Sequence, residues 1–171
     1  MAYLKCIQLQ AVRSLVRSRS FQFFILWTLG LLLGNLLSPP ATIAVPDPQL
    51  SWGGALIPRL VVISCPLALA GLAVQFSCVE LLLLVSIWKA ICYSYCGAFL
   101  YSLFGSAGWL MRFLYQFADI FAVPVFCWFC IRYISGKRPL RKSELLICLI
   151  VTLAAGAADH FLVVPFLANI L

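Results

Sequence analysis

Residues 144–167 read ELLICLIVTLAAGAADHFLVVPFL, and Glu144 and Asp159 carry the only formal charges in this run. An α-helix rises about 1.5 Å per residue, so about 20 apolar residues cross the roughly 30 Å hydrocarbon layer of a membrane. Ser143, directly before the run, suits a helix N-cap. The stretch therefore predicts a transmembrane helix over residues 144–167.

The rest of the chain has the same character. The 171 residues are 64% hydrophobic and 10% charged, and the mean hydropathy is +1.07. Soluble domains carry about 25% charged residues, so too few polar side chains remain here to cover a surface that faces water. We predict an all-α integral membrane bundle of about five transmembrane helices over residues 21–171, with spans at about 21–37, 55–74, 77–100, 109–131 and 144–167.

Residues 1–20 form a separate basic segment in this prediction. Apolar residues recur at helical spacing from Leu4 to Leu15, and basic residues lie off that stripe. Such a segment is typical of an amphipathic helix that lies on the inner headgroup layer. The alternative is a signal peptide, with residues 42–44 (Thr-Ile-Ala) as the cleavage site.

Lysine and arginine in the short loops predict the orientation, because cytoplasmic loops carry an excess of both. The loop over residues 38–54 contains neither, whereas the loop over residues 133–143 contains Lys137, Arg138, Arg141 and Lys142. The N-terminus is therefore predicted inside and the C-terminus outside. The formal net charge is +7, but the basic residues gather at membrane boundaries. This placement indicates lipid headgroups as the partner and argues against nucleic acid.

Ionisable side chains inside the predicted spans are the candidate functional residues. A charge at a helix centre costs about 2.5–3.5 kcal/mol on insertion scales, so unpaired charges are poorly tolerated. Three acidic and three basic residues suggest pairing inside the bundle, with Lys89 against Asp119, Asp159 or both as the first expectation. The full polar network is Lys89, Asp119, Asp159, His160, Glu80, Arg59 and Arg112.

The network has two interpretations. One is a proton or ion relay through Asp119, Lys89, Asp159 and His160. The other is a static set of contacts that fixes helix register, and we favour it because few serines, threonines or asparagines are present to line a water path. Arg59 and Arg112 are placed near the outer ends of their spans, where long basic side chains extend to the headgroups.

Two small motifs concern packing and redox chemistry. Gly30 and Gly34 form G-x-x-x-G, which predicts a helix-contact face, internal or with a partner. Cys127 and Cys130 form C-x-x-C, so a membrane thiol oxidoreductase is a rival function. Apolar surroundings keep a thiol protonated, and we therefore interpret all eight cysteines as packing residues. A single histidine and no glycine-rich phosphate loop favour no metal site, no cofactor and no enzymatic activity.

Several stretches are similar to the stage II sporulation protein M family of small multi-pass bacterial membrane proteins. They are residues 83–95, with the lysine and aromatics of KAICYSY, then FGSAG at 104–108, the opening run 23–34, and the end from Ala154 to Pro165. Ala90 stands where the family usually has glycine. The resemblance implies a non-enzymatic scaffold in the bacterial cytoplasmic membrane, which holds cell-wall remodelling proteins at the septum during spore engulfment. Its partners would be other membrane or septal proteins, as a homo- or hetero-oligomer. The alternative is a small transporter or permease subunit with a mid-membrane polar site.

Overall fold

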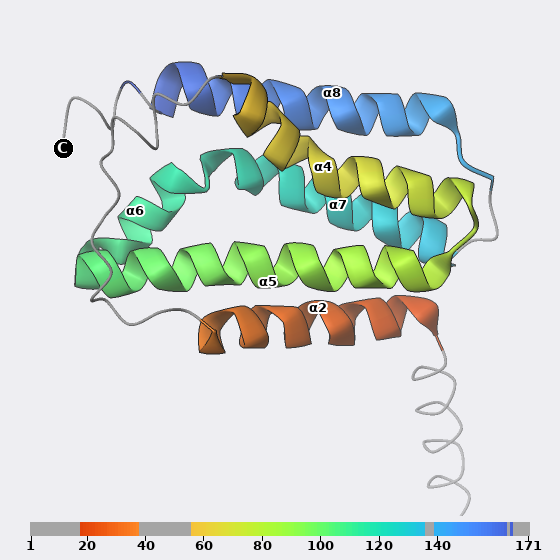
Figure 1. Ribbon diagram of the computed structural model, residues 1–171, viewed down its shortest axis with the longest axis horizontal. Helices are drawn as coiled ribbons and strands as arrows, with labels where there is room; N and C mark the ends of the chain where they lie inside the picture. The colour runs from red at the N-terminus through yellow and green to blue at the C-terminus, as the bar shows by residue number, and fades with distance from the viewer. Residues whose placement is uncertain (1–17, 38–55, 136–138, 164, 166–171) are drawn as a thin grey trace, which may run out of the picture.

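The computed structural model in Figure 1 describes residues 18–37, 56–135, 139–163 and 165, with the side chains of residues 57–59 and 135 excepted. Within these ranges the chain is helical, with short turns and no strand. The elements are α2 (Arg19–Leu36), α4 (Leu56–Gln75), α5 (Val79–Phe104), a 3₁₀ turn (Gly105–Ala107), α6 (Gly108–Tyr115), α7 (Phe117–Ser135), α8 (Lys142–Ala158) and a π-helical turn (Asp159–Val163). The predicted segment 1–20 and loop 38–54 lie almost wholly outside the described residues.

Three helical stretches are long and apolar enough to cross a membrane. They are Val79–Tyr115, Phe117–Ile134 and Lys142–Val163, and Leu60–Gln75 is a shorter apolar helix. The prediction of an all-helical chain is confirmed for the described residues, and these three helices have the length and composition that a membrane crossing needs.

The segment predicted as one span over residues 109–131 is divided. It consists of α6 and α7, and the helix breaks between them at Gln116, where φ is −106° and ψ is 22°. Figure 1 shows α6 returning diagonally from the far end of α5, with α7 continuing in a different direction. Hydropathy does not detect this bend, because the residues on both sides of it are mostly apolar.

Two other helix boundaries differ from the predicted ones. Helix α5 continues to Phe104 and ends where Gly105 has φ 55° and ψ −126°, a conformation that only glycine adopts readily. Helix α8 begins at Lys142 with Arg141 as its N-cap residue, so Ser143 lies inside the first turn. Glu144 lies in that turn as well, where its negative charge complements the helix dipole.

The helices lie in layers with roughly aligned axes (Figure 1). Helix α2 runs parallel to α5, whereas α4 and α7 run antiparallel to it. Helix α2 forms one outer layer and makes its main contact with α5. Helices α4 and α7 lie on the other side of α5, and α8 contacts both of them. Aromatic rings connect the layers, since Trp27 of α2 stacks on Phe23 and lies 6.1 Å from the ring of Phe126 in α7.

The contact between α2 and α5 depends on Gly30 and Gly34. A Cβ atom added at Gly30 would lie 2.8 Å from the Cβ of Ala90, and one added at Gly34 would lie 2.8 Å from the Cβ of Ser94. Ser94 also donates a hydrogen bond from Oγ to the Leu31 carbonyl, at 2.6 Å. The G-x-x-x-G face therefore packs inside this chain, and the backbones approach closely because neither glycine has a side chain.

We expect Gly34→Val to separate α2 from α5. The valine methyl groups would overlap the α5 backbone, and such overpacking costs typically about 1–3 kcal/mol. Leu32→Val is the control, because Leu32 is 57% exposed. Thermal unfolding in detergent should show a lower Tm for Gly34→Val and little change for Leu32→Val. An equal Tm for both variants would contradict the close contact.

Candidate functional site: a polar ladder between α5 and the α6–α7 bend

One face of α5 meets polar side chains from the α6–α7 bend. The α5 residues follow one another at a spacing of four, which places them on the same helix face. The facing residues run in the opposite order along the chain. We call this set the polar ladder, and its members are Lys89, Tyr93 and Gly97 of α5 with Asp119, Gln116 and Arg112 opposite.

The first rung is an ion pair. Lys89 Nζ donates to Asp119 Oδ1 at 2.6 Å, and the side chains are 11% and 20% exposed. Asp119 lies in the first turn of α7, part-way along the predicted span 109–131. Its carboxylate there complements both the Lys89 ammonium and the helix dipole.

Gln116 makes the second contact of the ladder and lies at the break between α6 and α7. Its side-chain Nε2 donates to the Tyr93 carbonyl at 2.8 Å, and the residue is 7% exposed. Its backbone N–H bonds to the Arg112 carbonyl, and its own carbonyl accepts from the Asp119 N–H, each at 2.9 Å. One residue therefore ends α6, starts α7 and ties the bend to α5.

Arg112 forms the third rung. Its Nε donates to Gln116 Oε1 at 3.0 Å, and its Cζ lies 5.0 Å from the centre of the Tyr93 ring. A Cβ at Gly97 would lie 2.5 Å from Arg112 Nε, so the missing side chain makes room for the guanidinium. Gly97 and the Tyr93 ring together form a surface on which the guanidinium lies. The expectation that Arg112 extends to the headgroups stays a prediction.

The other residues of the predicted network lie elsewhere. Glu80 is exposed in the first turn of α5 and accepts a long contact from Cys78 Sγ at 3.8 Å. It lies nine residues before Lys89, about 14 Å along the helix. Asp159 is 1% exposed at the start of the π-helical turn, and the His160 ring meets Phe161 edge-on at 5.1 Å. The side chain of Arg59 lies outside the described residues.

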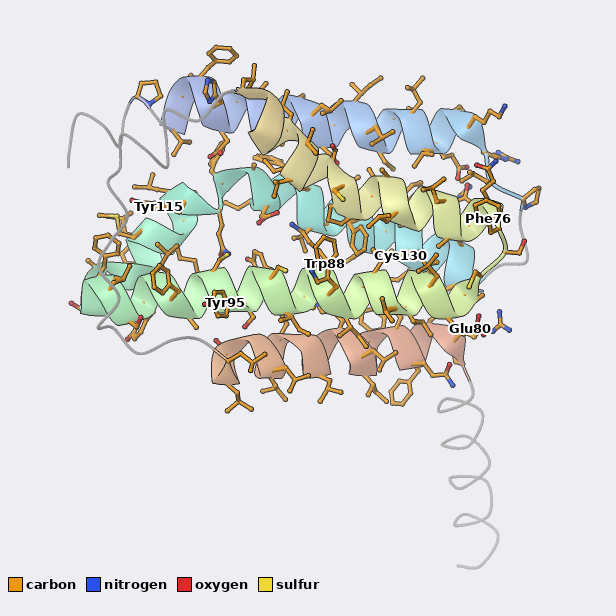
Figure 2. The ribbon with its side chains drawn as sticks, viewed as in Figure 1. Phe76, Glu80, Trp88, Tyr95, Tyr115 and Cys130 are labelled. Atoms are coloured by element: carbon orange, nitrogen blue, oxygen red, sulfur yellow. The ribbon has the colours of Figure 1, made fainter. Side chains whose placement is uncertain are left out.

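Of the C-x-x-C cysteines, Cys130 lies in the hydrophobic core of the bundle and Cys127 packs against it. Cys130 is 0% exposed and its Sγ accepts a hydrogen bond from Ser86 Oγ of α5 at 3.7 Å; Figure 2 shows it between α7 and α5. Cys127 is half-buried, and the seven cysteines in the described ranges are all free thiols. No group of three histidine, cysteine or acidic residues in the described part of the chain is arranged to hold a metal ion.

A second polar cluster fixes the corner between α7 and α8, and the sequence prediction missed it. Glu144 accepts from Arg132 Nη2 at 2.7 Å and from the Tyr133 hydroxyl at 2.9 Å. The Arg141 backbone N–H donates to that same hydroxyl at 3.0 Å. We call these residues the corner cluster. It ties the last turn of α7 to the first turn of α8.

Three ladder residues were also missed, namely Tyr93, Gly97 and Gln116. Gln116 is the one amide in the apolar stretch from Trp109 to Ile131, and an isolated amide there is a signal for a buried hydrogen bond. The spacing of Lys89, Tyr93 and Gly97 also places them on one helix face. The sequence contains no comparable signal for the glycine's role, because it depends on which side chain lies opposite.

Comparison with protein-family models, with curated proteins and with solved structures finds no match to this chain. The resemblance to the stage II sporulation protein M family therefore stays an expectation.

We expect Lys89→Met to lower the stability of the folded chain. It leaves the Asp119 carboxylate in low dielectric without its cation, and breaking a buried pair from one side costs typically about 3–5 kcal/mol. Lys89→Met combined with Asp119→Asn removes both charges and should recover much of that loss. Folded yield and Tm in detergent are the measurements, with exposed Glu80→Gln as the control. A Lys89→Met protein as stable as the parent chain would contradict the buried pair.

Proposed function

We propose that this chain is a multi-pass membrane protein that acts as a non-enzymatic assembly partner for other membrane proteins. One observation carries the proposal: polar side chains are used for contacts between helices, while the outer helix faces are apolar. The ladder ion pair, the Gln116–Tyr93 bond and the Ser94–Leu31 bond all join helices internally. Side chains that pair between helices hold the bundle in one arrangement.

The outer faces of the bundle support a lipid environment. Helix α2 and helix α8 both expose large apolar side chains, and soluble proteins rarely expose such side chains as contiguous surfaces. On α2 these include Phe24, Ile25, Leu29, Leu32 and Leu36; on α8 they include Leu146, Ile147, Ile150 and Val151. We infer five crossings, with α6 and α7 together forming the fourth.

The orientation follows from the positions of the basic residues. In Figure 1, the first residue of α2, the end of α7 and the start of α8 lie at the same end of the bundle. The described cations at that end are Arg19, Arg132, Arg141 and Lys142. The positive-inside rule assigns this end to the cytoplasm. The N-terminus is then inside and the C-terminus outside, in a bacterial cytoplasmic membrane.

The partner surface is assigned to α2. This helix is at the edge of the bundle and is held mainly by α5, so its opposite face is available to another transmembrane helix. The resemblance to the stage II sporulation protein M family suggests cell-wall remodelling proteins at a division or engulfment septum as partners.

A transporter or permease subunit is the second candidate, and one observation favours it. Asp159 is buried at the start of a π-helical turn, with His160 next to it. Single π-helical turns occur frequently at functional sites, and an acidic residue within a membrane helix is a candidate ion-binding group. In this alternative the Asp159 turn binds the transported ion or substrate.

Co-purification from membranes in mild detergent separates the two candidates. An assembly partner should recover septal or cell-wall enzymes, and Leu32→Asn with Leu36→Asn on the open face of α2 should abolish that recovery. Ile147→Asn with Ile150→Asn on α8 is the matched control and should not. Recovery of an ATPase instead, unaffected by the α2 changes, would favour the transporter.

The proposed topology predicts a labelling pattern. In a chain whose native cysteines are replaced, a single cysteine at Gln49 should react with an impermeant thiol reagent added to intact cells. A single cysteine at Lys137 should react only after the membrane is opened, because the basic α7–α8 connection faces the cytoplasm. Labelling of both positions in intact cells would exclude this topology.

A further inference from the structure

A groove lies between the end of α4 and the start of α8. Its volume is about 320 Å³, at the lower end of the roughly 300–1,000 Å³ range of small-molecule sites. One polar side chain from each helix and four leucines form its lining, which is Gln75, Lys142, Leu140, Leu145, Leu146 and Leu149. The two helices come close beside it, since a Cβ at Gly71 of α4 would lie 2.9 Å from Leu145 Cδ2.

The groove is next to the corner cluster. The contacts of Glu144 within that cluster explain why the charge at the groove is positive. Glu144 is the acidic residue of this region, and its two oxygens accept from Arg132 and Tyr133, with Arg141 Nη1 at 3.9 Å from Oε1. Among the described residues, no carboxylate forms an ion pair with Lys142, which is exposed at the groove. The groove therefore has a cationic mouth and an apolar wall.

We propose that this groove binds one anionic phospholipid. The Lys142 ammonium pairs with the phosphate, the Gln75 amide donates to a headgroup oxygen, and one acyl chain lies along Leu145, Leu146 and Leu149. The start of α8 adds to the attraction, because the first N–H groups and the helix dipole are positive there. A free phosphate would leave the leucines uncovered. A zwitterionic phospholipid carries its own cation, which offsets the phosphate charge with which Lys142 would pair.

The inference rests on the membrane location proposed above and adds a specific lipid to it. The bound lipid would join α4 to α8 on the side of the bundle where the corner cluster already joins α7 to α8. It would also select anionic membranes, because the charge of Lys142 has no counterion within the described protein. The groove thus couples membrane composition to the packing of α4 on α8.

Native mass spectrometry of the purified full chain tests the proposal, with dioleoyl phosphatidylglycerol against dioleoyl phosphatidylcholine as probes. One phosphatidylglycerol should be retained in preference to phosphatidylcholine. Lys142→Gln should weaken its binding about tenfold or more, because a charge-assisted hydrogen bond is lost. Lys142→Arg should keep the binding. Arg141→Gln is the matched control for charge, since it removes a neighbouring cation that does not line the groove, and its effect should be smaller.

The apolar wall is tested separately. Leu146→Trp should fill the groove and weaken phosphatidylglycerol binding with Lys142 intact, whereas Ile147→Trp, also exposed on α8 but outside the groove, should not. Equal losses for Lys142→Gln and Arg141→Gln would overturn the proposal in favour of diffuse attraction. Binding of glycerol phosphate as tight as that of the lipid would overturn the role of the leucines. Binding of an acidic amphipathic peptide but not of phosphatidylglycerol would assign the groove to a protein instead. None of these results bears on the membrane location, which the thiol-labelling experiment tests separately.

Discussion

The ion pair between Lys89 and Asp119 constrains the central part of this structure. Each charge alone would be costly in an apolar bundle, so the two side chains must stay together, and they belong to different helices. Because Asp119 lies in the first turn of α7, the pair fixes where α7 begins relative to α5. The bend at Gln116 then follows, since α6 must bring the chain back from the end of α5 to that position. Gln116 and Arg112 complete the contact with hydrogen bonds to the Tyr93 carbonyl and within the bend.

Glycine residues add close packing between helices, which a single ion pair does not provide. In a lipid environment the hydrophobic effect gives little preference for helix–helix over helix–lipid contact, so close van der Waals packing and buried hydrogen bonds hold helices together. Gly30 and Gly34 allow α2 to approach α5 until Ser94 reaches the Leu31 carbonyl. Gly97 serves a different purpose, because it makes room for the Arg112 guanidinium. The same residue type thus supports a backbone contact in one place and a half-buried cation in another.

The charged residues at the ladder and at the α7–α8 corner are of two kinds: those paired within the corner cluster or the ladder, and exposed Lys142. Glu144 accepts from Arg132 and Tyr133 at one end of the bundle, and Asp119 pairs with Lys89 in its interior. Lys142 is exposed beside the corner cluster, next to an apolar groove. This division relates structure to the proposed function: paired charges keep the helices in place, and an exposed cation beside leucines is suited to the surrounding lipid. In the proposed function, the apolar outer face of α2 is the surface for a partner helix.

The sequence by itself determined the helical class, the approximate helix positions and the candidates for pairing. Hydropathy and helix length do not depend on tertiary contacts, so α2, α4, α5 and α8 fall near their predicted ranges. The choice of Asp119 for Lys89 had to come from the tertiary structure, because Asp119 and Asp159 have similar apolar surroundings in the sequence. Tertiary structure likewise decided the division of residues 109–131 into α6 and α7, the contacts of Arg112 with Tyr93 and Gly97, and the corner cluster. Each depends on what lies opposite a residue in space, and local pattern carries no information about a neighbour that is distant along the chain.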